Sequence, residues 1–252
     1  MKIQDSVVIV TGGASGLGAA CVRDFVKKGA YVSVFDLSED DGEKISLEMG
    51  DNVIFCKTDV SNDQAVKAAI EKTIKTFGRI HTAINCAGIV GSSKVLTRHG
   101  PISMDHFTRV VHNNLMGTMN VVRLAAEKMI KNIPNDDGEK GVIVNTASIA
   151  AFEGQVGQVA YSASKAAIVG MTSPIAREFA GYGIRIMTIS PGFFDTSMMA
   201  NAPKKALEIL NKALHFPMRM GKPSEFSQLV MQIIENPMLN GSNIRIDAAL
   251  RG

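Results

Sequence analysis

Short apolar runs alternate along this chain with longer stretches in which apolar residues recur every three to four positions. The short runs have the length of β-strands, and we expect strands at residues 6–11, 31–35, 53–58, 80–85, 141–146, 184–189 and 243–246. The longer stretches predict helices at residues 16–28, 40–49, 62–77, 104–130, 159–180, 204–213 and 224–235. Because strands that alternate with helices form βαβ units, the pattern predicts an α/β fold with a seven-stranded parallel sheet.

No linker, repeat or low-complexity tract divides the chain, so we expect residues 1–252 to form a single domain. Hydrophobic residues make up 46% and charged residues 20%, a balance typical of a globular chain. A net charge of +3, without a run of lysine or arginine, indicates neither a nucleic-acid partner nor a membrane surface. No uncharged apolar stretch reaches the ~20 residues of a spanning helix, so we expect no membrane partner.

The cysteines and histidines show no metal-ligand spacing. Cys21, Cys56 and Cys86 are scattered and odd in number, which argues against a disulfide framework and predicts a reducing compartment. The sequence starts directly with an apolar strand and shows no leader segment, so we expect the cytoplasm, or the mitochondrial matrix in a eukaryote. The five histidines lack ligand spacing, and no metal is expected.

A glycine-rich turn, residues 11–18, follows the first predicted strand and opens the first predicted helix. Small residues let the backbone approach a pyrophosphate, and the helix N-terminus offers free N–H groups to it. The spacing Gly-x-x-x-Gly-x-Gly departs from the usual G-x-G-x-x-G, and a tight turn without a ligand is the alternative. The candidate phosphate contacts are Gly12, Ser15, Gly16, Leu17 and Gly18.

Asp36 ends the second strand, where a dinucleotide-binding fold places the carboxylate that binds the adenosine ribose. This carboxylate would repel a 2′-phosphate, and neither Ala14, Ser15 nor Leu37 provides a cation, so the sequence predicts NAD rather than NADP. A solvated strand end is the alternative. Further candidate cofactor contacts follow the third and fourth strands, at the sheet edge where open α/β sheets bind ligands: Asp59, Val60, Asn85, Ala87 and Gly88.

Tyr161 and Lys165 are four residues apart in a predicted helix and therefore share a face. An ordinary phenol titrates near ~10 and is a poor base at neutral pH. We expect the Lys165 ammonium to lower the pKa of Tyr161 through its opposite charge to the phenolate, which would make the tyrosine a usable acid and base.

These motifs, taken in chain order, resemble the signatures of the short-chain dehydrogenase/reductase family over essentially the whole chain. The matching positions are residues 11–18, residues 85–88, Asn114, Ser148, Tyr161 with Lys165, and Pro191-Gly192 with Thr196. The resemblance implies a single Rossmann-type three-layer domain, with residues 191–221 as a short helical lid over the substrate. It also implies nicotinamide contacts at the start of that lid, from Pro191, Gly192, Phe194 and Thr196.

The same resemblance implies a catalytic group of four residues. Tyr161 would exchange the proton of a substrate alcohol, and Ser148 would hydrogen-bond the developing carbonyl oxygen. Lys165 would also hold the nicotinamide ribose, and Asn114 would anchor a water. Asn113 is the alternative to Asn114, and a hydroxyl that caps a turn is the alternative for Ser148.

Residues 145–158 and 234–247 resemble the family members that oxidise 3-hydroxyacyl-CoA, in which Gln155 would lie beside the substrate together with Ser148 and Tyr161. The implied function is NAD-dependent oxidation of the 3-hydroxyl of a short or branched acyl-CoA by a homotetramer. The lid is rich in phenylalanine and methionine, which suits an apolar ligand or packing on the core. The alternatives are another apolar secondary alcohol, of steroid or 3-oxoacyl-carrier-protein type, and an NAD-binding scaffold.

Overall fold

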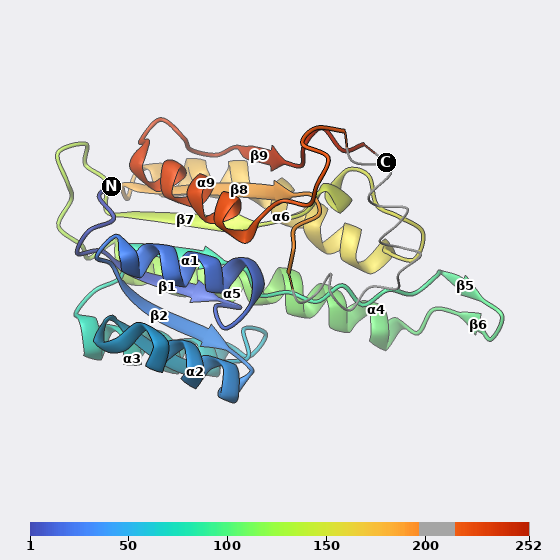
Figure 1. Cartoon of the computed structure of the whole chain (residues 1–252), viewed down its shortest axis with the longest axis horizontal. Helices are drawn as coiled ribbons and strands as arrows, with labels where there is room; N and C mark the ends of the chain where they lie inside the picture. The colour runs from blue at the N-terminus through green and yellow to red at the C-terminus, as the bar shows by residue number, and fades with distance from the viewer. Residues whose placement is uncertain (197–214, 252) are drawn as a thin grey trace.

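The computed structural model describes residues 1–196 and 215–251. Within them, seven parallel strands form one sheet in the order β3-β2-β1-β4-β7-β8-β9 (Figure 1). The strands are β1 (Val7–Thr11), β2 (Tyr31–Asp36), β3 (Val53–Lys57), β4 (Thr82–Asn85), β7 (Gly141–Thr146), β8 (Ile184–Pro191) and β9 (Asn243–Ile246). The predicted seven-stranded parallel sheet is confirmed, and the strand ends differ from the predicted ones by at most two residues.

Helices cover both faces of the sheet and make the three predicted layers (Figure 1). One layer contains α1 (Gly16–Lys27), α2 (Glu39–Met49) and α9 (Pro223–Glu235). The other contains α3 (Asp63–Phe77), α4 (Met104–Val111), α5 (Gly117–Met129) and α6 (Val159–Ala180). The helix predicted at residues 204–213, within the predicted lid, lies outside the described residues.

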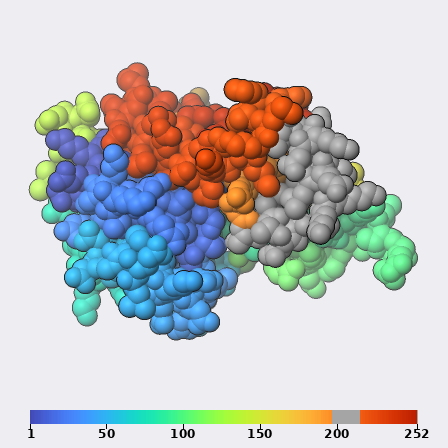
Figure 2. All heavy atoms as spheres, in the orientation of Figure 1, coloured from blue at the N-terminus to red at the C-terminus, as the bar shows by residue number. Residues whose placement is uncertain are grey.

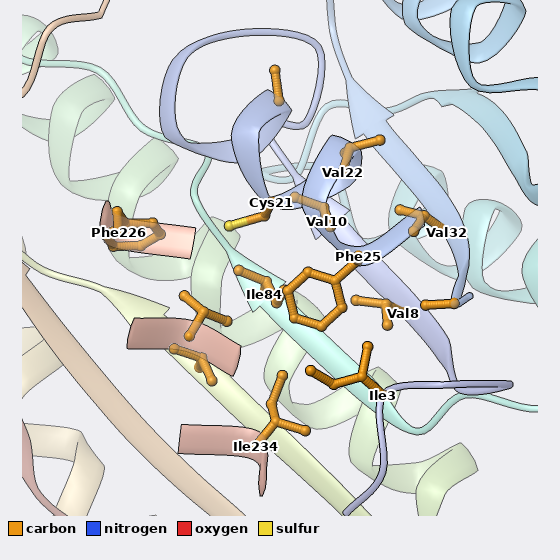
Figure 3. Packing of buried hydrophobic residues seen from close by; sticks show 14 of the residues in the cluster. Ile3, Val8, Val10, Cys21, Val22, Phe25, Val32, Ile84, Phe226 and Ile234 are labelled. Atoms are coloured by element: carbon orange, nitrogen blue, oxygen red, sulfur yellow. The ribbon is translucent and has the colours of Figure 1, made fainter. Parts of the chain in front are cut away.

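The alternation of side chains along the strands divides the core into two clusters. Val8 and Val10 of β1 face a cluster under α1 and α9, whereas Ile9 faces a cluster under α3, α5 and α6. In the first cluster, the Phe25 ring points toward Ile84 and Val8 (Figure 3). In the space-filling view, the C-terminal segment packs along the N-terminal one on this side (Figure 2). Central strands are apolar throughout because both faces of a parallel sheet are covered.

Two local features differ from the sequence-based expectation. The helix predicted at residues 104–130 contains one turn of π-helix, His112–Met116, between α4 and α5. Residues 91–101, where the pattern predicted neither a strand nor a helix, include a small antiparallel hairpin of β5 (Leu96–Thr97) and β6 (Gly100–Pro101). Strands of two residues are too short to show an alternating pattern, so the sequence contained no signal for them.

The strand order reverses direction between β1 and β4, which are neighbours in the sheet although β2 and β3 lie between them in sequence. The connections from β1 and β2 place α1 and α2 on one face, and the connections from β3 and β4 place α3 and α5 on the other. Such a reversal opens a crevice outside the carboxyl ends of the strands. This edge of the sheet is where a ligand site is expected.

Candidate active site

A cavity of 770 Å³ lies at the carboxyl ends of the strands and extends toward the start of the predicted lid. It brings together most of the residues that the sequence indicated. Those that line it are Gly12, Ser15, Gly16, Leu17, Gly18, Asp36, Val60, Ala87, Gly88, Ser148, Gln155, Tyr161, Lys165, Pro191, Gly192, Phe194 and Thr196.

The glycine turn forms the floor of one end of this cavity. Gly16 begins α1 with φ of +52°, a conformation that glycine adopts without strain. A Cβ atom on Gly18 would lie 2.2 Å from the Gly12 carbonyl oxygen, so only glycine permits this close packing of turn and helix. Ser15 occupies the N-cap without a side-chain capping hydrogen bond, which leaves its hydroxyl available to a ligand. The residues therefore fit a dinucleotide pyrophosphate at the N-terminus of α1.

Asp36 is held at the end of β2 with its carboxylate on the cavity wall. One oxygen accepts a hydrogen bond from the Ala14 backbone N–H (3.0 Å) and the other from the Ser38 N–H (3.1 Å). These two bonds orient the carboxylate and leave further lone pairs for the hydroxyls of a ribose. The backbone of the glycine turn thus positions the group that the sequence assigned to ribose binding.

Tyr161 and Lys165 lie in the first turns of α6, and both line the cavity. The Lys165 ammonium nitrogen is 5.7 Å from the centroid of the Tyr161 ring. It donates a hydrogen bond to the carbonyl oxygen of Thr146 (2.7 Å) at the end of β7. Ser148 follows β7, and its hydroxyl accepts a hydrogen bond from the Ala150 N–H (3.1 Å). The side chain therefore caps a turn, as the alternative interpretation predicted, and it also lines the cavity.

Burial shifts the pKa values of both Tyr161 and Lys165. Burial raises the pKa of the Tyr161 phenol above its usual value, and the Ser148 hydroxyl lowers it by a smaller amount. Burial also lowers the pKa of the Lys165 ammonium to about 8. The expectation that the pKa of Tyr161 lies below its usual value is wrong, because loss of water around the phenol is the largest effect on it.

Asn114 lies in the π-helical turn and is fully buried. Its side-chain amide donates to the carbonyl of Ile89 (2.9 Å) and to the Ser164 hydroxyl (3.0 Å), and its oxygen accepts from the Ile89 N–H (2.8 Å). Asn113, the alternative, lines the cavity instead. Asn114 is thus held beside the catalytic helix, although it does not line the cavity.

Two predicted cofactor residues also stand behind the cavity wall. Asp59 accepts hydrogen bonds from the backbone N–H and hydroxyl of Ser61 (2.9 and 2.7 Å). Asn85 donates to the buried side chain of Asn145 on the neighbouring strand (2.8 Å). Both side chains stabilise the strand ends and do not line the cavity.

Several cavity residues were not assigned to the site from the sequence. Cys86 lies in the wall and accepts a hydrogen bond from the Thr146 hydroxyl (3.6 Å). Glu153 and Arg251 are brought to the opposite end by the loop after β7 and by the C-terminal segment. The other lining residues that the sequence did not assign to the site are Phe35, Thr58, Ile89, Val90, Thr146, Ala147, Ile149, Ala150, Gln158, Phe193 and Leu250.

The described part of the chain contains no cluster of three or more histidine, cysteine or acidic side chains that could hold a metal ion. No helix within residues 1–196 and 215–251 is long and apolar enough to cross a membrane.

The doubly wound fold and the Tyr161–Lys165 pair in its cavity agree with a known family. The chain belongs to the short-chain dehydrogenase family, whose model, described as short chain dehydrogenase, matches residues 6–207. It is an oxidoreductase of this family with a nicotinamide cofactor, and the resemblance inferred from the sequence is confirmed.

Similar proteins narrow the class further. The chain is 49% identical over 251 residues to 3-hydroxyacyl-CoA dehydrogenase type-2 of Drosophila melanogaster, covering 99% of this chain and 98% of that protein. It is 47% identical over 252 residues to the protein of the same name from Homo sapiens, covering 99% and 97%. The crystal structure of 3-hydroxyacyl-CoA dehydrogenase type-2 from Mycobacterium avium superposes with a TM-score of 0.93 at 37% identity, over 100% of this chain and 98% of that one.

Proposed function

We propose that this protein oxidises the 3-hydroxyl group of a short or branched 3-hydroxyacyl-CoA to the 3-oxoacyl-CoA, with NAD as the hydride acceptor. The observation that carries the proposal is the placement of Tyr161, Lys165 and Ser148 in the same cavity as the glycine turn and Asp36. The substrate class is supported by the names of the two relatives, which cover nearly the whole chain at 47–49% identity.

Each side chain has a distinct task in this proposal. Tyr161 accepts the proton of the substrate alcohol, and the Ser148 hydroxyl donates to the carbonyl oxygen that forms. When bound, NAD supplies the hydride-accepting carbon and a positive charge. Burial raises the pKa of Tyr161. Lys165 binds the nicotinamide ribose, and in the complex its ammonium and the cofactor charge oppose this shift, because both are positive charges near the phenolate. Gln155 contacts the acyl portion at the far end of the cavity.

The choice of NAD rests on Asp36. Its carboxylate is fixed by Ala14 and Ser38, so it cannot turn away from a 2′-phosphate without losing two hydrogen bonds. Among the described residues that line the cavity, the cations are Lys165 and Arg251. Lys165 lies at the catalytic end and Arg251 in the C-terminal segment, so neither would offset the repulsion between Asp36 and a 2′-phosphate. We therefore propose NAD in preference to NADP.

The Tyr161→Phe substitution tests the assigned proton acceptor. We expect turnover of 3-hydroxybutyryl-CoA to fall by at least ~10²-fold, because the phenolic oxygen is removed while the ring is kept. NAD affinity, measured by fluorescence titration, should stay close to that of the parent. Unchanged turnover would refute the role of Tyr161. A parent protein that binds NAD but turns over none of the alcohols would favour an NAD-binding scaffold, which has no use for the phenol.

A second candidate is the oxidation of another apolar secondary alcohol, of steroid or 3-oxoacyl-carrier-protein type. The cavity wall favours an apolar ligand of some kind, since Ile89, Val90 and Phe193 line it. Steady-state assays with acyl-CoA, acyl-carrier-protein and free alcohols separate the candidates. If free alcohols are oxidised orders of magnitude faster than acyl-CoA, the first proposal fails.

We also propose a homotetramer in a reducing compartment. The exposed Phe152 and Val156 lie beside α6, and their exposed fractions of 50% and 86% are high for apolar side chains. The three cysteines are free thiols, as a reducing compartment requires. Light scattering coupled to gel filtration measures the mass directly; a monomer of 27.0 kDa would contradict the tetramer.

A further inference from the structure

The hydroxyl of Ser164 joins segments of the chain that are far apart in sequence. Ser164 immediately precedes Lys165 in α6 and is fully buried. Its oxygen donates a hydrogen bond to the carbonyl of Tyr161 (2.7 Å) and accepts one from the Asn114 side-chain amide (3.0 Å), 50 residues away in sequence. The hydroxyl is therefore fixed in both roles, as donor and as acceptor.

Asn114 depends on this hydroxyl for its orientation. A side-chain amide has two N–H hydrogens; one is taken by the Ile89 carbonyl and the other by Ser164. The amide oxygen accepts from the Ile89 N–H (2.8 Å), and the Thr118 hydroxyl donates to the Asn114 carbonyl (2.7 Å). Without Ser164, one buried N–H would have no partner, a situation that proteins avoid.

Asn114 belongs to the π-helical turn between α4 and α5. Such a turn interrupts the regular i→i−4 hydrogen-bond ladder of a helix and is frequent at functional sites. The turn His112–Met116 packs against α6. Among the described residues, the bond from Asn114 to Ser164 is the only side-chain hydrogen bond between the π-turn and α6.

Asn114 in turn faces the catalytic lysine. A Cβ atom on Gly88 would lie 3.1 Å from the Asn114 amide oxygen and 3.5 Å from the Lys165 ammonium nitrogen. The oxygen and the ammonium therefore approach the same point beside the cavity loop. A shift of Asn114 changes the dipole that faces Lys165 and also moves Ile89, which lines the cavity.

We propose that Ser164 is a positioning residue of this dehydrogenase: its hydroxyl locks Asn114 of the π-turn onto the catalytic helix and so fixes the surroundings of Tyr161 and Lys165. The proposal rests on the Tyr161 chemistry of the proposed function but not on the identity of the alcohol. It is therefore tested with whichever alcohol the unmodified enzyme oxidises fastest.

The Ser164→Ala variant removes both hydrogen bonds. We expect kcat to fall by about tenfold or more, because small displacements of catalytic groups reduce rates strongly. The dissociation constant for NAD should change by less than about threefold, since the glycine turn and Asp36 are untouched. If the Asn114 oxygen moves away, Lys165 loses a favourable dipole and becomes a weaker cation, so the limb of the kcat–pH profile that reports Tyr161 should move to higher pH.

Thr172→Val is the matched control on the same helix. Thr172 is 2% exposed, and its hydroxyl bonds to the Ile168 carbonyl (2.8 Å) and to the Thr188 hydroxyl (2.6 Å) on β8. This variant also deletes a buried hydroxyl that joins α6 to another element. We expect Thr172→Val to lower the melting temperature, as Ser164→Ala does. Its kcat and its pH profile should stay like those of the parent.

Two further variants at position 164 separate hydrogen bonding from packing. Ser164→Thr keeps the hydroxyl and should restore kcat and the pH profile, whereas Ser164→Cys keeps the approximate size with a weak donor and should behave like alanine. Parental kcat and pH profile in Ser164→Ala or Ser164→Cys would overturn the proposal. So would an equal loss of kcat in Thr172→Val. Each result is a ratio of the variant to the unmodified enzyme, so it does not depend on which alcohol is the substrate. Failure of the acyl-CoA assignment would instead appear in the assays that compare acyl-CoA, acyl-carrier-protein and free alcohols.

Discussion

Lys165 carries its ammonium group into the protein interior, where it donates a hydrogen bond to the carbonyl of Thr146. Burial lowers its pKa to about 8, from an ordinary value of 10.5. The unfolded chain therefore binds more protons than the folded chain between these two values. The penalty for burying the charge is fully present below pH 8 and is removed as pH rises toward 10.5. Stability and chemistry thus place opposite demands on this residue.

Replacing Lys165 by methionine should stabilise the fold while it abolishes turnover. We expect the free energy of unfolding at pH 7 to rise by about 1–3 kcal/mol. This is the cost of burying the ammonium, which the variant avoids, minus the contribution of the hydrogen bond to Thr146, which it loses. Urea denaturation at pH 7 and pH 9.5 measures this, and the gain should be smaller at pH 9.5. A variant less stable than the parent at pH 7 would show that the ammonium contributes more through its contacts than burial costs.

The strands at one side of the sheet are joined to their neighbours by a buried ion pair. The Arg185 guanidinium of β8 donates a hydrogen bond to the Glu139 carboxylate (2.6 Å), and Glu139 lies just before β7. Both side chains are less than a tenth exposed. The same guanidinium donates to the carbonyls of Ile233 and Ile234 in α9 (both 2.9 Å). One side chain therefore connects a strand, the segment before the adjacent strand, and a helix.

Glu139→Ala should destabilise the protein by about 3–5 kcal/mol, because it leaves the Arg185 charge buried without its partner. Urea denaturation measures the change. Glu48→Ala is the control, since Glu48 pairs with Arg23 at the surface (2.8 Å), where solvent screens the charges. Equal effects of the two substitutions would contradict this difference between buried and exposed pairs.

The cavity is assembled from both halves of the chain, from the glycine turn to the C-terminal residues 250 and 251. A cofactor that binds there stabilises the whole fold by mass action, by about 2.7 kcal/mol at a hundred times its dissociation constant. Cofactor preference is therefore visible in the melting temperature of the intact protein.

We expect NAD to raise the melting temperature more than NADP at equal concentration, because the Asp36 carboxylate repels a 2′-phosphate. In Asp36→Ala this difference should shrink, with weaker stabilisation by NAD. Asp51→Ala, at an exposed position outside the cavity, should leave the difference unchanged. If NADP stabilises the unmodified protein as strongly as NAD does, the assignment of NAD is wrong.

Much of this architecture was predictable because it depends on local patterns. Apolar runs of strand length, separated by amphipathic stretches, are enough to predict parallel βαβ units, and six of the seven predicted helices lie in described residues where a helix is present. The glycine turn was recognisable because its backbone requires residues without a Cβ atom. Tyr161 and Lys165 were recognisable because four residues of helix place two side chains on one face.

The strand–helix alternation, the family and the motif residues that line the cavity could be predicted from the sequence, since each follows from periodicity or from a spacing along one element. The surroundings of these residues could not, because they depend on how the chain folds back on itself. The π-turn at Asn114, the bond from Asn114 to Ser164 and the arrival of Glu153 and Arg251 at the cavity depend on contacts between distant segments. The raised pKa of Tyr161 belongs to this second group, because desolvation depends on how completely other segments cover the phenol.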